Sequence, residues 1–60
     1  MTHEQFAQWR KYMGWTKTLA AKQLGLSRRT IEYYENGTHS VPRHIHLACL
    51  ALKHGVRLDD

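Results

Sequence analysis

The chain has 60 residues, which is enough for a single domain over residues 1–60, and its 42% hydrophobic content argues against a disordered segment. No apolar run is long enough to cross a bilayer, the first residues lack the features of a secretory signal, and the single cysteine, Cys49, has no partner for an internal disulfide, so we expect a cytoplasmic protein. Nine Lys and Arg against five Asp and Glu give a net charge of +4, which suits a polyanionic partner or, equally, a solvated basic face.

A first helix is expected to begin at Thr2, because Thr2 and Gln5 have the spacing of a capping box. It should end at Gly14. One face of this helix carries residues at intervals of three and four, and Arg10 is the only charged residue among them. A buried guanidinium needs a partner, so Arg10 should face an acidic side chain. The members of this face are Phe6, Trp9, Arg10 and Met13.

Two short helices are expected in the middle of the chain, over residues 17–24 and 28–36. Thr16 and Ser27 are good N-cap residues, and a glycine follows each run. Gly25 can adopt the left-handed conformation that ends a helix without a steric penalty. The resulting turn has the length and glycine content typical of a helix-turn-helix motif.

The helix expected over residues 28–36 has two different faces when 100° is counted per residue. Its inner face includes a carboxylate, Glu35, which we expect to form an ion pair with Arg10. Two arginines in the first turn oppose the helix dipole, a cost that suggests a binding role. The inner face holds Ile31, Tyr34 and Glu35, and the outer face holds Arg28, Arg29, Glu32 and Tyr33.

A fourth helix should include Pro42 in its first turn and last to about His54. It carries two apolar stripes, one more than packing against the other helices requires. One stripe consists of Ile45, Ala48, Cys49 and Leu52, and the other of Leu47, Leu50 and Ala51. The second stripe is either covered by Val56 and Leu58 or part of a dimer surface, for which the candidates are Leu47, Leu50, Val56 and Leu58.

Together these elements predict an all-α fold, a compact bundle of four main helices. The run from Thr16 to Gly37 resembles the helix-turn-helix of the lambda repressor and Cro superfamily, also called the XRE family. The run from Ile45 to Leu52 is also similar to the helix that follows in that family. The matching positions are Thr16, Ala21, Leu24-Gly25-Leu26-Ser27, Thr30-Ile31, Glu35-Asn36-Gly37 and Pro42.

The resemblance implies a dimeric transcriptional repressor, often of phage or mobile-element origin, that binds a palindromic operator in double-stranded DNA. The second helix of the motif enters the major groove, the first crosses the DNA backbone, and an Arg–Glu bridge recurs. Small regulators of this type also occur in phage operons, including those that accompany anti-CRISPR genes, where an autoregulatory role would fit. The chain departs from the family at Lys17, where glutamine is common, and from its sequence we expect no fifth helix of the kind that many members use to dimerise.

The candidate DNA contacts follow from this placement. An arginine fork matches O6 and N7 of guanine, so Arg28 and Arg29 are expected to read bases. Glu32 would either hold an arginine or accept from cytosine, and Tyr33 would contact a thymine methyl or a phosphate. Contacts to the DNA backbone are expected from the surrounding positions. These are Lys17, Ser27, Thr30, Asn36, Thr38 and Arg43.

Other functions have less support in the sequence. His46 and Cys49 are the only potential metal ligands on one side of their helix, whereas structural zinc takes four, so no metal and no cofactor is expected. No catalytic set can be assembled from the five acidic residues, and we expect no enzyme. The alternative is a protein-interaction module, such as an antitoxin, that uses the apolar surface of the fourth helix.

Overall fold

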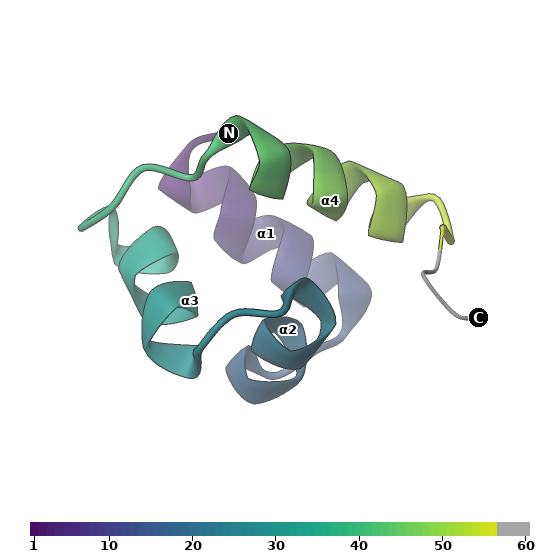
Figure 1. Cartoon of the computed structure of the whole chain (residues 1–60), viewed down its shortest axis with the longest axis horizontal. Helices are drawn as coiled ribbons and strands as arrows, with labels where there is room; N and C mark the ends of the chain where they lie inside the picture. Colours follow the sequence, from purple (N-terminus) through teal and green to yellow (C-terminus); the bar gives the residue numbers. More distant parts are fainter. Residues whose placement is uncertain (57–60) are drawn as a thin grey trace.

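The structure is a computed structural model, which describes residues 1–56. These residues form four α-helices and the loops that connect them. They are α1 (His3–Met13), α2 (Lys17–Leu24), α3 (Arg28–Asn36) and α4 (Arg43–Lys53). α3 packs against α2 and α1, and α4 packs across α1 and α2 (Figure 1). The predicted all-α bundle is confirmed. None of these helices is long and apolar enough to span a membrane.

The first three helices begin where the sequence predicts, because each has a side chain that caps it. The hydroxyls of Thr2, Thr16 and Ser27 each accept a hydrogen bond from the backbone N–H three residues on, at 3.1, 3.1 and 3.2 Å. At α1 the capping box is complete, since the Thr2 N–H donates to Oε1 of Gln5 at 2.9 Å. Local hydrogen bonding therefore fixes these helix starts.

The turn between α2 and α3 depends on Gly25, which has a φ of +70°. In this left-handed conformation the chain turns back, and the N–H of Leu26 donates to the carbonyl of Ala21 at 2.8 Å. Any residue with a Cβ would be strained here. Gly25 thus ends α2 and lets α3 begin three residues later, against α2.

The start of α4 differs from the prediction that Pro42 lies in its first turn. Pro42 is instead the N-cap, with an extended ψ of 156°, and α4 begins at Arg43. The Pro42 carbonyl accepts hydrogen bonds from the N–H groups of Ile45 and His46, at 3.1 and 3.0 Å. The extended ψ keeps Pro42 outside the helix, so the boundary moves by one residue. Its carbonyl still accepts the first hydrogen bonds of α4, and its missing N–H leaves no donor unpaired.

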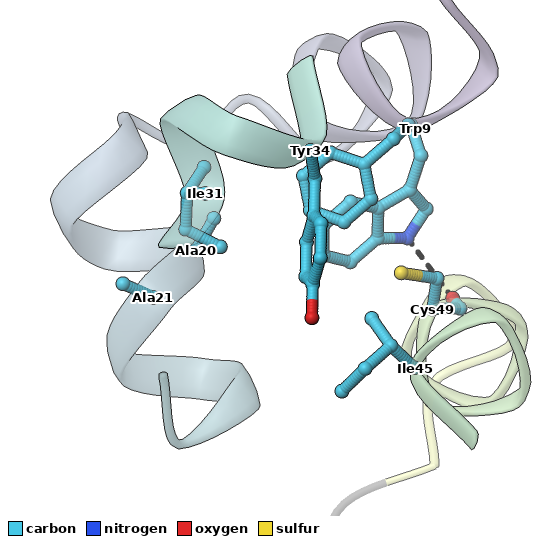
Figure 2. Close-up of a cluster of buried hydrophobic side chains, with 8 residues drawn as sticks. Trp9, Ala20, Ala21, Ile31, Tyr34, Ile45 and Cys49 are labelled. Atoms are coloured by element: carbon cyan, nitrogen blue, oxygen red, sulfur yellow. Dashed lines mark hydrogen bonds between the residues drawn. The ribbon is translucent and has the colours of Figure 1, made fainter. Parts of the chain in front are cut away.

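The core forms where all four helices meet, and three aromatic rings pack together within it (Figure 2). Phe6 packs with its ring centroid 5.5 Å from that of Trp9 and 5.4 Å from that of Tyr34. The indole N–H of Trp9 donates a buried hydrogen bond of 2.9 Å to the carbonyl of Cys49, which connects α1 to α4. The buried residues are Phe6, Trp9, Ala20, Ala21, Ile31, Tyr34, Ile45 and Cys49.

The second apolar stripe of α4 remains largely exposed. Leu47 and Leu50 are 52% and 41% exposed, so any cover from Val56, itself 51% exposed, is partial. The fourth dimer candidate, Leu58, lies outside the described residues. An apolar surface of this kind is available to a partner.

The bond between Trp9 and Cys49 leads to a prediction about stability. Trp9→Phe should lower the free energy of unfolding by about 1–2 kcal/mol, because phenylalanine cannot donate to the carbonyl and leaves part of the site unfilled. Urea denaturation followed by circular dichroism measures the loss. Trp15→Phe is the control, since Trp15 is only partly buried and its indole donates no hydrogen bond within residues 1–56. Equal losses in the two variants would contradict the importance of the bond.

Candidate functional site

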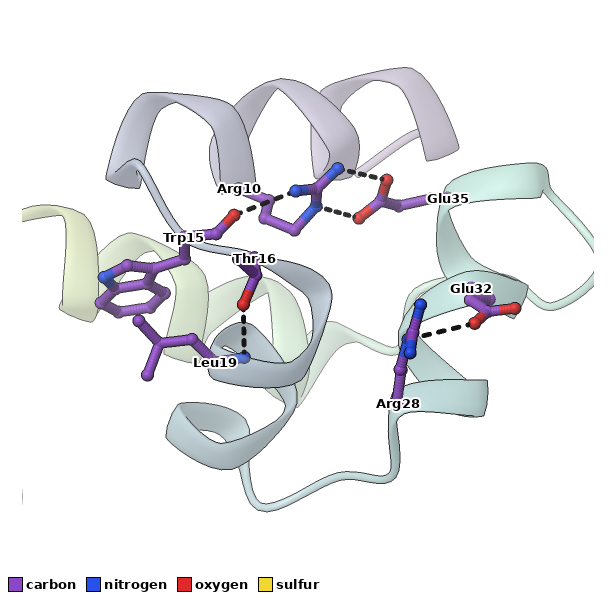
Figure 3. A network of polar contacts seen from close by, with 7 residues as sticks. All are labelled: Arg10, Trp15, Thr16, Leu19, Arg28, Glu32 and Glu35. Carbon is purple, nitrogen blue, oxygen red and sulfur yellow. Dashed lines mark hydrogen bonds and ion pairs between the residues drawn. The ribbon is translucent and has the colours of Figure 1, made fainter.

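The outer face of α3 carries the side chains expected to contact bases. Arg28 and Arg29, in the first turn, are both exposed. Nε of Arg28 lies 3.5 Å from Oε1 of Glu32, one turn further along (Figure 3). Both side chains of this pair are well exposed, at 65% and 45%, so the pair contributes little to stability. The Arg28 side chain in this pair points along the helix toward Glu32. Arg29, the next residue, is also exposed.

The inner face of α3 is tied to the rest of the molecule by Arg10. The Arg10 guanidinium donates to both carboxylate oxygens of Glu35, from Nε to Oε2 at 2.5 Å and from Nη2 to Oε1 at 3.1 Å. Its Nη1 donates to the carbonyl of Trp15 at 2.9 Å (Figure 3). The expected ion pair is therefore present, and both side chains are less than a fifth exposed. One side chain of α1 fixes both α3 and the turn that leads into α2.

The N-terminus of α2 is the candidate site for a DNA phosphate. Thr16 satisfies the N–H of Leu19, and the N–H groups at the start of the helix have no partner inside it. These donors and the positive end of the helix dipole favour an anion. Lys17 is the first residue of the helix and is half-buried.

Four of the six expected backbone contacts pair with one another. Oγ of Ser27 and Oγ1 of Thr30 are 2.9 Å apart, so one hydroxyl donates to the other and a single hydroxyl hydrogen remains for a phosphate. Oδ1 of Asn36 accepts from both the N–H and the hydroxyl of Thr38. The Thr38 hydroxyl hydrogen is thereby used, while the side-chain NH₂ of Asn36 remains as a donor. Arg43 is exposed at the first position of α4.

The structure adds His39, a residue that the sequence reasoning did not identify. Its imidazole and the ring of Tyr33 form a T-shaped pair, with centroids 4.7 Å apart and planes at 85°. The N–H of His39 also donates to the carbonyl of Tyr33 at 3.3 Å. The spacing of six residues across a loop gives no periodic signal from which this contact could be predicted.

The histidines and the cysteine do not assemble into a metal site in the part of the chain described. No group of three or more His, Cys, Asp or Glu residues is placed to hold an ion within residues 1–56. Burial raises the pKa of the Cys49 thiol to about 12, so the thiol stays protonated at neutral pH and is a poor ligand.

Comparison with known proteins agrees with this geometry. The model of the family described as "Helix-turn-helix domain" matches residues 4–58. The structure of "Putative DNA Binding Protein NE0471" from Nitrosomonas europaea is similar, with a TM-score of 0.84 and 40% sequence identity. The likeness covers 88% of this chain and 34% of that one, so this chain spans about a third of its length. No curated protein matches the chain.

The two glutamates of α3 provide a matched test of the bridge from Arg10. Glu35→Gln should lower the free energy of unfolding by about 3 kcal/mol, the lower end of the range for breaking a buried ion pair, because the guanidinium loses its counter-charge. Glu32→Gln, the same change at an exposed pair, should cost less than about 1 kcal/mol. Chemical denaturation of both variants measures the difference. If they unfold at the same denaturant concentration, the bridge does not have the role assigned to it.

Proposed function

Because this chain belongs to the helix-turn-helix domain family, we propose that it binds double-stranded DNA sequence-specifically, with α3 in the major groove, and acts as a transcriptional repressor of the lambda repressor and Cro type. The observation that carries the proposal is the outer face of α3, where Arg28 and Arg29 are exposed in the first turn of a helix whose inner face is locked to α1. A helix presented in this way suits entry into the groove with its N-terminal end first.

The two arginines and their neighbours would read the base pairs. A guanidinium fork donates to O6 and N7 of guanine, and a good bidentate contact discriminates by about 1–3 kcal/mol. Arg28, which pairs with Glu32, is oriented before DNA arrives and loses less side-chain freedom on binding. Tyr33 lies one turn beyond Arg29 and would contact a thymine methyl group.

Phosphate contacts would set the register of α3 in the groove. Lys17 and the start of α2 supply a charge and backbone donors on one side, and Asn36 supplies its side-chain NH₂ at the end of α3. Ser27 and Thr30 share one available hydroxyl hydrogen, and Arg43 adds a charge. The sequence-independent part of the affinity and its dependence on salt would come from these groups.

Dimerisation would use the exposed leucines of α4, Leu47 and Leu50, together with Val56, which follows the helix and is also exposed. A groove of about 470 Å³ runs beside Leu50 between α1 and α4, and its lining includes Trp9 and Tyr12. Two copies related by a two-fold axis would place their recognition helices about 34 Å apart, one turn of B-DNA. A palindromic operator follows from that symmetry.

The second candidate is a protein-interaction module, such as an antitoxin, which the same exposed stripe favours. Salt separates the two functions. DNA binding should weaken steeply as salt rises, because each neutralised phosphate releases counterions, whereas an apolar protein interface should respond little.

The base-reading role leads to a prediction about specificity. Arg28→Ala and Arg29→Ala should each weaken binding to a specific duplex by about tenfold or more while changing binding to random DNA far less, because each loses a bidentate guanine contact. Lys17→Ala should weaken binding to both duplexes similarly and lower the salt dependence. Selection from random duplex DNA supplies the specific sequence, and fluorescence anisotropy at two salt concentrations gives the affinities.

The selection also tests symmetry, because a dimer of this kind should enrich a palindrome. Equal losses on specific and random DNA for the arginine variants would refute the assignment of base contacts. Selection without any enriched sequence, together with partner binding that is insensitive to salt, would favour the interaction module instead.

A further inference from the structure

The loop that follows α3 has a defined shape, which brings one side chain back onto the recognition face. Gly37 takes a φ of +83°, and the side chain of Asn36 accepts hydrogen bonds from Thr38, including one from its N–H at 2.8 Å. The N–H of His39 then donates to the carbonyl of Tyr33. The backbone itself therefore holds His39 beside the last turns of α3.

The imidazole of His39 contacts the aromatic ring of Tyr33 in an edge-to-face arrangement, with the centroids 4.7 Å apart. Aromatic rings prefer this geometry, in which the positive edge of one ring meets the negative face of the other. Tyr33 is half-buried on the outer side of α3, while His39 is exposed. A tyrosine on a helix surface can adopt more than one rotamer, and the imidazole restricts that choice.

We propose that His39 is a positioning residue for DNA recognition: it holds the Tyr33 ring where the ring packs against the 5-methyl group of a thymine. This inference rests on the proposed function and deepens it, because it assigns the recognition of one base type to a pair of residues. Tyr33 makes the contact, and His39 acts only through Tyr33. Thymine differs from uracil by that methyl group alone, so the contact has a direct chemical probe.

The experiment uses the duplex selected by the full chain, with single thymines replaced one at a time by deoxyuridine. The unsubstituted protein should bind more weakly by about fourfold at one position of the half-site, as expected for one methyl-sized group no longer buried. Tyr33→Ala should abolish this preference. His39→Ala should remove at least half of it, and the double variant should resemble Tyr33→Ala alone.

His39→Phe is the decisive variant, because phenylalanine keeps an aromatic edge and carries no charge or hydrogen-bonding group. It should retain the preference for thymine over uracil. Ser40→Ala, in the next residue of the same exposed loop, is the control and should also retain it. Thermal unfolding of each variant shows whether the fold is intact, and a contrast between His39→Phe and His39→Ala keeps the test informative even if both are less stable.

The outcomes separate this inference from the function on which it rests. If the protein selects a sequence but His39→Ala leaves the thymine preference unchanged, or weakens all duplexes equally, the positioning role is refuted while the proposed function stands. Equal behaviour of His39→Phe and His39→Ala would likewise overturn it. If the protein enriches no sequence at all, the proposed function fails and the positioning role fails with it.

Discussion

The structure depends on the guanidinium of Arg10, which lies at the junction of α1, α3 and the turn before α2. A mostly buried charge is costly unless it is paired and hydrogen-bonded, and Arg10 directs two donors to the Glu35 carboxylate and one to the carbonyl of Trp15. Bidentate geometry gives direction as well as attraction, so the bridge constrains the rotation of α3 about its own axis. Apolar packing alone would hold α3 against the core with less control over which residues face outward.

The rest of the recognition surface follows from that constraint. With Ile31 turned inward, the helical repeat places Arg29 and Tyr33 on the opposite side, and Arg28, at the first position of α3, is exposed as well. The same repeat allows the exposed i, i+4 pair between Arg28 and Glu32. Ser27 pairs with Thr30 at the start of α3, and Asn36 pairs with Thr38 at its end, so these pairs limit the hydrogens that the proposed phosphate contacts could use.

The sequence predicts most features that arise from local chemistry. The cap Thr16 and the glycine Gly25 fix the boundaries of α2. The Arg10–Glu35 pair could be predicted because each helix, α1 and α3, carries one charged residue on its inner face. The prediction that Pro42 lies in the first turn of α4 is wrong, because the sequence does not specify ψ, and the extended ψ of Pro42 places it outside the helix. The contact of His39 with Tyr33 was missed because the path of a loop sets it. Which residues touch DNA stays a prediction.

The outer face of α3 is the surface that we propose to meet DNA. Backbone amide chemical shifts of the full chain, recorded during titration with the selected duplex, test it most directly. We expect the largest changes in the first turns of α3 and at the start of α2, around Arg28 and Lys17, because these amides would meet bases and phosphates. Changes confined to the groove between α1 and α4, around Tyr12 and Leu50, with α3 unaffected, would contradict it.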